Sequence, residues 1–273
     1  MTARLAKERK SPKAKGWGPW APFFQLGREE RDPATISGGV GQSAEDALKW
    51  LAVSLVPLEV VSPPLPLARL GEVEDLIAKL RTAGARGTAD RLVNAFGMQL
   101  KVEIPRADAD TLLAYLQVFL CLYDWLLMRA DIDLSRRMTS YVDPFPRDYV
   151  LRVVDSDYRP ELAGLMDDYL AASPTRNRAL DLLPLFLHLD KARVRRVTGD
   201  PRIKARPAFH YRLPDCEIDQ PGWGLHSAWN DWIEVERIAW RPAAHGIARS
   251  SPVPPSPRWN PATTRRATPS RCR

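Results

Sequence analysis

The residues most suited to chemistry lie at the start of the segment Arg206–Trp240, in the short sequence FHYR. In it His210 and Arg212 alternate with two aromatic residues. Side chains along a β-strand point alternately to opposite faces, so His210 and Arg212 share one face of a strand predicted over residues 207–214. That face is either solvated or part of a concave site where cationic groups hold phosphate or carboxylate.

A second strand, predicted over residues 96–105, has the same alternation. Gln99, Lys101 and Glu103 fall on one face, and apolar residues fall on the other. Taken alone, the pattern is typical of a sheet with one solvated face. Two such strands together allow a second interpretation, in which their polar faces line one binding site.

Glu59 is the one ionisable residue in the apolar sequence VPLEVVSPPL, which predicts a strand over residues 56–65 that ends at Pro63 and Pro64. A lone carboxylate in such a strand is either exposed at an edge or functional. As a functional group it suits Mg²⁺, which takes one or two carboxylates and shares the phosphates of a nucleotide.

Three polar residues, Arg176, Asn177 and Arg178, stand at the expected start of a helix over residues 177–190. Free backbone N–H groups at a helix start favour anions, and arginines strengthen that preference. The sequence therefore predicts either an anion-binding turn or a helix entry with solvated arginines. Pro184 predicts a break or kink in this helix, and Asp181 is expected on a helix face or as a cap.

The elements that must position these residues form an α+β pattern. Further helices are predicted over residues 43–53, 71–87, 108–130, 160–173 and 227–240, from apolar residues at helical spacing. Gly84 is expected to terminate the second of these. The tryptophans of the last helix, Trp229, Trp232 and Trp240, are expected in the core.

Length and composition limit the classes of protein. The 273 residues suit one large domain with tails, which we place at residues 1–43 (irregular), 44–240 (catalytic domain) and 241–273 (disordered, basic and Pro-rich). The net charge of +7 resides at the ends, because residues 1–15 carry +5 and residues 241–273 carry +7. The remaining residues are mildly acidic, which makes nucleic-acid binding an unfavoured interpretation. No apolar run is long enough to span a membrane and no signal segment is recognised, so we expect a cytoplasmic protein.

Several common site motifs are missing from the sequence. It contains no GxGxxG, GxxxxGK[ST], GxSxG or HExxH motif, and its three cysteines have no zinc-site spacing. The polar residues on the two strands are therefore not part of a dinucleotide-binding, P-loop, serine-hydrolase or zinc-protease motif.

Six segments in order resemble the bacterial amidoligase family, within the glutamate–cysteine ligase and glutamine synthetase group of carboxylate–amine ligases. They are VPLEVVSPPL, LRTAGARGT, AFGMQLKVEIP, YVDPFPRDYV, MDDYLAASPTRNRALDLLPLF and RPAFHYRLPDCEID…WNDWIEVE, and they cover roughly residues 50–240. The resemblance implies an antiparallel sheet curved into a half-open, glutamine-synthetase-like funnel with helices outside. It also implies a reaction in which ATP and Mg²⁺ convert a carboxylate to an acyl phosphate, from which an amine displaces phosphate.

The resemblance also implies roles for the polar residues. The resemblance implies that the metal and the nucleotide are bound by Glu59, Glu103, Gln99 and Lys101. It implies that His210 and Arg212 bind the oxygens of phosphate or of the acyl phosphate. It implies that phosphate or the substrate carboxylate is positioned by Arg176, Asn177 and Arg178. The implied substrates are peptide-like or amino-acid-like. The sequence identifies neither the carboxylate nor the amine, and it does not give the oligomeric state.

Two departures from the family pattern bear on activity. The group begins with a strand of the type G-x-E-x-E whose glutamates bind metal, and residues 1–43 contain no such sequence. Lys101 stands where a metal ligand is expected. The alternative to an active ligase is therefore an inactive ligase-like binding module with a divergent or truncated N-terminal segment. The less favoured third interpretation is a protein that binds nucleic acid through its basic ends.

Overall fold

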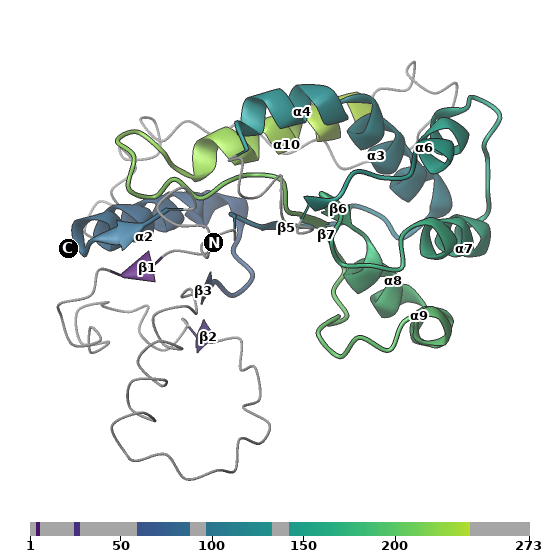
Figure 1. Ribbon diagram of the computed structural model, residues 1–273, viewed down its shortest axis with the longest axis horizontal. Helices are drawn as coiled ribbons and strands as arrows, with labels where there is room; N and C mark the ends of the chain where they lie inside the picture. Colours follow the sequence, from purple (N-terminus) through teal and green to yellow (C-terminus); the bar gives the residue numbers. More distant parts are fainter. Residues whose placement is uncertain (1–3, 6–24, 28–58, 88–96, 133–141, 241–273) are drawn as a thin grey trace, which may run out of the picture. The chain divides into compact units, whose positions relative to one another are not determined.

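A computed structural model describes residues 4–5, 25–27, 59–87, 97–132 and 142–240 of the chain (Figure 1). Contacts divide the chain into two compact units, residues 1–97 with 216–224, and residues 98–215 with 225–273. The described elements confirm the predicted α+β class. The half-open funnel stays a prediction, because the largest sheet among the described residues has three strands.

The described residues of the first unit form two small antiparallel strand pairs and one long helix. Its elements are β1 (Arg4–Leu5) paired with β4 (Ala85–Arg86), β2 (Gln25–Gly27) paired with β3 (Glu59–Val61), the 3-10 helix η3 (Leu67–Arg69) and α2 (Leu70–Thr82). Strand β3 confirms the strand predicted over residues 56–65. The helix predicted over residues 43–53 lies outside the described residues.

Helix α2 forms because its apolar residues recur at helical spacing. Ile77 and Leu80 on its inner face are buried. The helix is followed by Gly84 at φ 83°, a left-handed conformation that glycine adopts without steric cost, so the predicted terminator is confirmed. Arg81 near its end donates to the carbonyl oxygens of Ile218 and Trp223, at 2.7 Å each. These bonds hold residues 216–224 to the helix within the same unit.

The second unit is built around the three-stranded antiparallel sheet β5–β7–β6. Its strands are β5 (Leu100–Glu103), β7 (Ala208–Tyr211) and β6 (Leu180–Asp181). Both polar strands predicted from the sequence are thus present and adjacent. In their register, His210 on the central strand lies between Lys101 on one neighbour and Asp181 on the other.

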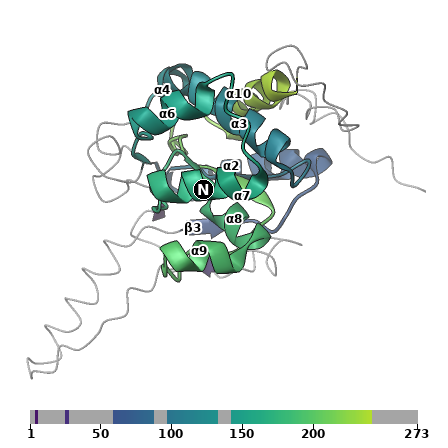
Figure 2. The same ribbon diagram turned by 90° about the vertical axis from the view of Figure 1, so that its right-hand side faces the viewer.

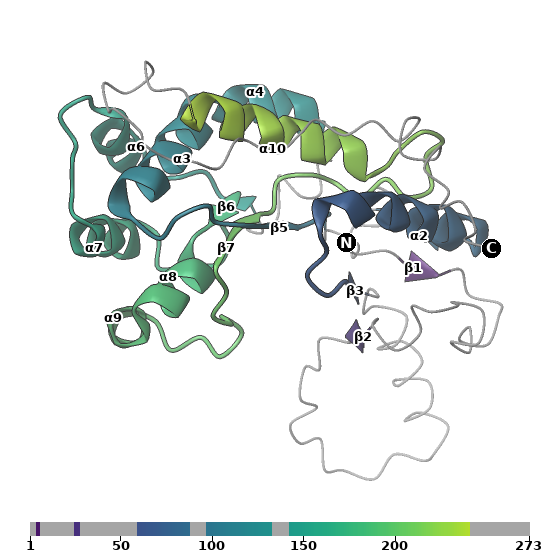
Figure 3. The same cartoon turned by 180° about the vertical axis from the view of Figure 1, so that it is seen from behind.

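The apolar face of this sheet forms the core of the unit. Phe209 stacks on Tyr115 of α3 (Ala109–Cys121) with ring centroids 4.8 Å apart. Both Phe209 and Tyr211 also contact Trp232 of α10 (Leu225–Ala239), which is fully buried. Figures 1 and 3 show α3 and α10 running beside the strands. The core position predicted for the tryptophan stripe is confirmed for Trp229 and Trp232.

The remaining helices among the described residues of this unit are α4 (Tyr123–Ala130), α6 (Arg147–Val154), α7 (Leu162–Ala172), α8 (Leu183–Leu189) and α9 (Lys191–Val197). Figure 2 shows α6, α7 and α9 from the side. The helix predicted over residues 108–130 is divided into α3 and α4 by a bend of 62°. No single described helix is long and apolar enough to cross a membrane, and only this bent pair reaches that length and composition together.

The helix predicted over residues 177–190 is wrong in its first half. Leu180 and Asp181 form strand β6, and the helix begins only at Leu183. The hydroxyl of buried Tyr169 donates to the Leu180 carbonyl at 3.2 Å and accepts from the Leu182 N–H at 3.0 Å, which holds the strand in place. Pro184 occupies the first turn of α8, where a missing N–H costs nothing, so it does not kink the helix.

Candidate functional site

The polar face of the sheet in the second unit brings together six residues from three strands or their immediate extensions. They are Gln99, Lys101, Glu103, Asp181, His210 and Arg212. The side chains of Phe209 and Tyr211 point into the core, so by alternation those of His210 and Arg212 lie on the opposite face. This polar face is the candidate site.

Burial decides between the two interpretations of the strand over residues 207–214. His210 is 7% exposed and Arg212 is 8% exposed. The solvated interpretation is therefore wrong for this strand, because solvated histidine and arginine side chains keep most of their surface in water. On β5, by contrast, Lys101 and Glu103 are exposed, so the solvated interpretation holds for that edge of the face.

His210 lies between two polar side chains. Its Nε2 is 2.8 Å from Oε1 of Gln99, and its Nδ1 is 3.6 Å from Oδ2 of Asp181. Burial lowers the pKa of His210 to about 4, with smaller lowering contributions from the positive charges of Arg212 and Lys101, and Asp181 opposes the shift. The imidazole is therefore neutral at neutral pH.

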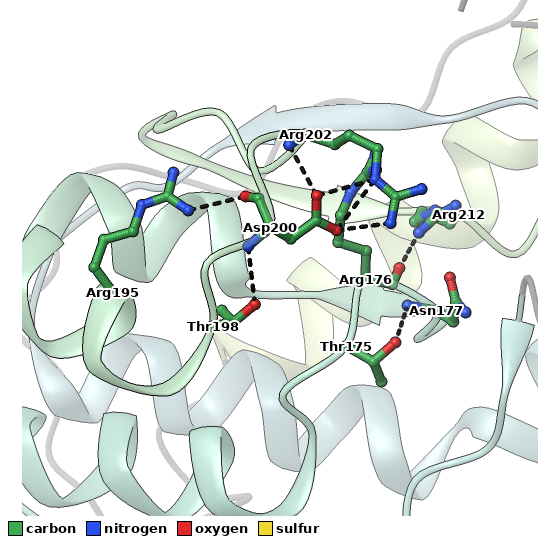
Figure 4. A network of polar contacts seen from close by, with 8 residues as sticks. All are labelled: Thr175, Arg176, Asn177, Arg195, Thr198, Asp200, Arg202 and Arg212. Atoms are coloured by element: carbon green, nitrogen blue, oxygen red, sulfur yellow. Dashed lines mark hydrogen bonds and ion pairs between the residues drawn. The ribbon is translucent and has the colours of Figure 1, made fainter. Parts of the chain in front are cut away.

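Arg212 is fixed by the loop that carries Arg176. The backbone N–H of Arg212 donates to the Ala179 carbonyl at 2.8 Å, which continues the β6–β7 ladder. Its guanidinium donates to the carbonyl oxygen of Arg176, as Figure 4 shows. Arg176 itself is half-buried. The Arg212 side chain is thus held by the backbone of a segment 36 residues away in the chain.

A neighbouring loop places a carboxylate near these arginines. Asp200 makes ion-paired hydrogen bonds with Arg202, the shortest at 2.9 Å, and its backbone carbonyl accepts from Arg195 at 2.9 Å (Figure 4). Hydrogen bonding from Arg202 lowers the pKa of Asp200, and the charge of Arg176 adds to this effect. No sequence pattern singles out Asp200, because its partners are set by loop geometry.

Arg178 and Asn177 serve the loop and do not reach the polar face through any described contact. Arg178 donates to Ser173 Oγ at 3.1 Å and to the Pro144 carbonyl, and its guanidinium lies 5.6 Å from the ring centroid of Phe145. The Asn177 carbonyl accepts from the Asp143 N–H at 2.7 Å. The helix start predicted at these residues is wrong, because α8 begins only at Leu183. Their predicted role toward phosphate or a carboxylate stays a prediction.

The described residues offer few metal ligands. No group of three or more His, Cys, Asp or Glu side chains among them is arranged to hold a metal ion. Glu103 is an exposed carboxylate at one end of the polar face, opposite Ala208. Glu59 lies in β3 of the other unit, with its backbone opposite Gly27, and its side chain lies outside the described residues. The predicted metal role of both residues stays a prediction.

Asp181 is the site residue that sequence reasoning missed. It is fully buried, and its Oδ1 accepts from the Leu183 N–H at 3.0 Å, so the expected capping role is only part of its function. A signal for it was present, because Asp181 is the one ionisable residue in the apolar run ALDLLPLF. The same reasoning had singled out Glu59. A helix over residues 177–190 does not pair with a strand, so the helix prediction could not place Asp181 opposite His210.

Comparison with protein families decides the assignment. Residues 6–234 match the model of the family described as "Putative amidoligase enzyme". The chain belongs to this amidoligase family. The match covers both units and every residue of the polar face, and it begins within the segment predicted to diverge from the family. No curated protein and no solved structure gives a significant match.

Proposed function

We propose that this amidoligase-family chain is an ATP-dependent carboxylate–amine ligase that acts through an acyl phosphate. The observation that carries the proposal is the buried pair His210 and Arg212 on the polar face of the sheet. Burying a charged guanidinium costs free energy unless it is paired, and a buried imidazole with a perturbed pKa is typical of functional sites. The family assignment gives the class of chemistry.

The residues present fit the anionic part of a nucleotide. Arg212 and Lys101 supply positive charge on the polar face, and guanidinium groups match phosphate geometry well. We propose that the side chain of Arg176 adds a third positive charge. Glu103 supplies one carboxylate on the same face, within the one or two that Mg²⁺ takes when it shares phosphate oxygens. We propose Gln99 as a polar contact on the nucleotide side.

The residues of the chain would bind and orient the reacting groups. Bound ATP and Mg²⁺ supply the phosphoryl group and neutralise its charge. Arg212, held by the Arg176 carbonyl, presents an orientated cation where negative charge develops, which is the main way that proteins stabilise phosphoryl-transfer transition states. The burial of Arg212 keeps water from screening that charge. Arg178 supports the loop that carries Arg176.

The proposal is tested with hydroxylamine as the amine, since acyl phosphates react with it to give hydroxamates, which are detected as coloured complexes with ferric iron. The full chain is incubated with Mg²⁺, ATP and a panel of amino acids and dipeptides as carboxylates. We expect hydroxamate and ADP to form together with at least one carboxylate. The Arg212→Ala variant should lose about 10²-fold or more of this activity.

Arg237→Ala is the matched control, because Arg237 is an exposed arginine on α10 that pairs with Glu234 of the same helix. It should retain full activity. ADP release that is equal in wild type and Arg212→Ala would reject Arg212 as an anion-binding residue. Absence of hydroxamate and ADP with every carboxylate, from a folded sample, would favour the inactive binding module.

The proposed substrates are a carboxylate and an amine of peptide-like or amino-acid-like character. Their identity follows from the same panel, because the carboxylate that supports ADP release is the substrate class. The cytoplasmic location predicted from the sequence stays a prediction.

A further inference from the structure

Asp181 carries a carboxylate oxygen that lacks a conventional hydrogen bond. The residue is fully buried in β6. Its Oδ1 accepts from the Leu183 N–H at 3.0 Å, whereas its Oδ2 is buried and accepts no hydrogen bond in the described part of the chain. A buried acceptor without a donor is destabilising, and more so when it is charged. The polar atom facing Oδ2 is Nδ1 of His210, 3.6 Å away.

The two ring nitrogens of His210 therefore have different neighbours. Nδ1 faces the Asp181 carboxylate and Nε2 faces the side-chain amide of Gln99 at 2.8 Å. A neutral imidazole carries one proton, on one nitrogen only. A carboxylate can be satisfied only by a donor, whereas an amide offers its oxygen or its NH₂ group after a half-turn. The arrangement that faces each acceptor with a donor places the ring proton on Nδ1, toward Asp181, and turns the NH₂ of Gln99 toward Nε2.

The charged groups around the ring support a neutral imidazole. They are Asp181 on β6, Lys101 on β5 and Arg212 at the end of β7. Burial and the two cations lower the pKa of His210 to about 4, although Asp181 opposes this effect. At neutral pH the ring carries one proton on one of its two nitrogens, and the Asp181 carboxylate favours the proton on Nδ1, the nitrogen that faces it.

We propose that Asp181 is a positioning residue that keeps the ring proton of His210 on Nδ1, so that Nε2 accepts the proton of the amine substrate. The inference rests on the proposed ligase function. In the step concerned, the amine nitrogen forms a bond to the acyl carbon, and the bond from that carbon to the phosphate oxygen breaks. Phosphate leaves with the electron pair, and one amine proton passes to Nε2. The resulting imidazolium is stabilised by the negative charge of the Asp181 carboxylate that faces Nδ1.

The inference changes the role that the sequence suggested for His210. An imidazole whose Nε2 has a lone pair repels phosphate oxygens, so it suits the N–H of an amine. Phosphate binding is then left to Arg212. Gln99 lies at Nε2 and is half-buried, so it either holds the amine or is displaced by it.

The first test measures the tautomer directly. Long-range ¹H–¹⁵N correlation spectra of the ¹⁵N-labelled full chain distinguish a protonated from an unprotonated ring nitrogen for each histidine. The chain has 4 histidines, and the signals lost in His210→Gln are those of His210. We expect wild type at neutral pH to show a protonated Nδ1 and an unprotonated Nε2. A protonated Nε2 in wild type would overturn the inference without any activity measurement.

The isosteric variant Asp181→Asn extends this test. The amide introduced by this substitution would offer an NH₂ group to Nδ1, and the ring proton should move to Nε2, as in catalytic triads that lose their aspartate. Circular dichroism and the melting temperature show whether the variant folds. If it does not fold, the wild-type spectrum alone decides the inference.

The second test separates the amine step from acyl-phosphate formation. The amine step is measured as the amount of amide formed with ammonium as the source of the amine. Acyl-phosphate formation is measured as positional isotope exchange in ATP, in the presence of the carboxylate that yields hydroxamate. In Asp181→Asn we expect amide formation to fall by about 10²-fold or more, with isotope exchange retained. Asp190→Asn, at the N-cap of α9, is the control and should retain both. An equal loss of both steps, or no loss of the amine step, would contradict the inference.

The two tests also separate failure of this inference from failure of the ligase proposal. If wild type shows neither isotope exchange nor hydroxamate, the ligase proposal fails, and the role of His210 as an amine base fails with it. The tautomer spectrum then still shows whether Asp181 orients the ring.

Discussion

At the scale of single residues, the buried imidazole of His210 makes stability depend on pH. Its pKa falls from 6.5 to about 4 on folding, mainly because burial disfavours the charged ring. In the unfolded chain the imidazole therefore takes up a proton near pH 6.5, whereas in the folded chain it does so only near pH 4. Stability is fully present above pH 6.5, and roughly 3 kcal/mol is lost as the pH falls to about 4.

Urea unfolding of wild type and His210→Gln across this range isolates the effect. Glutamine does not titrate, so the wild type should lose stability relative to the variant as the pH falls. Parallel curves for the two proteins would mean that the ring takes up its proton at the same pH in the folded and the unfolded chain.

The residue pattern predicted part of the site and missed part of it. Alternation alone placed His210 and Arg212 on one face, because the period of a strand is a local property. It did not predict that this face is buried, since the carbonyl of Arg176 that binds Arg212 comes from a distant segment. Asp181 was missed because the apolar residues around it suit a helix as well as a buried strand.

At the scale of elements, the turn after β4 requires glycine at position 87. A Cβ atom there would lie 2.4 Å from the Cys216 carbonyl oxygen and 2.6 Å from Asp219 Oδ1. Gly87→Ala should therefore cost about 1–3 kcal/mol of unfolding free energy, as expected for overpacking against backbone. Gly199→Ala is the control, because a Cβ atom at Gly199 meets nothing within 4 Å. Similar urea midpoints for the two variants would show that residues 216–224 shift to make room for the Cβ atom at little cost in stability.

The start of α3 depends on a side-chain cap. Asp108 Oδ1 accepts from the Thr111 N–H at 2.8 Å, which satisfies one of the free donors of the first turn. We expect Asp108→Ala to lower the free energy of unfolding by about 0.5–2 kcal/mol and Asp108→Asn to lower it much less, because asparagine caps nearly as well. Thermal and urea unfolding measure both. An equal loss in the two variants would point to the charge of Asp108 as the source of its effect.

Most described elements were predictable, and the exceptions have physical causes. Helices α2, α7 and α10 have clear periodicity and were predicted close to their bounds. The prediction over residues 108–130 missed the bend, because apolar residues continue through Leu122 without Gly or Pro. The short helices α6 and α9 were not predicted, since segments of 8 and 7 residues have too little periodicity to stand out.

At the scale of the whole molecule, the C-terminal part of the excess positive charge lies outside the family match. The match ends at residue 234, and residues 241–273 carry seven arginines and no acid. We therefore expect a chain truncated after Trp240 to bind Mg²⁺-ATP with unchanged affinity. Loss of ATP binding on truncation would assign the tail to the site. Strong, salt-sensitive binding to nucleic acid that is lost on truncation would instead support the third interpretation.

The central claim is that the amidoligase-family chain retains a working nucleotide site. Calorimetric titration of the full chain with ATP, with and without Mg²⁺, tests it most directly, because it requires no knowledge of the carboxylate or amine. We predict binding that depends on Mg²⁺ and is weakened by Arg212→Ala and not by Arg237→Ala. Absence of binding by a folded sample, with Mg²⁺ present, would contradict the ligase proposal and leave the polar face of the sheet as part of an inactive family member.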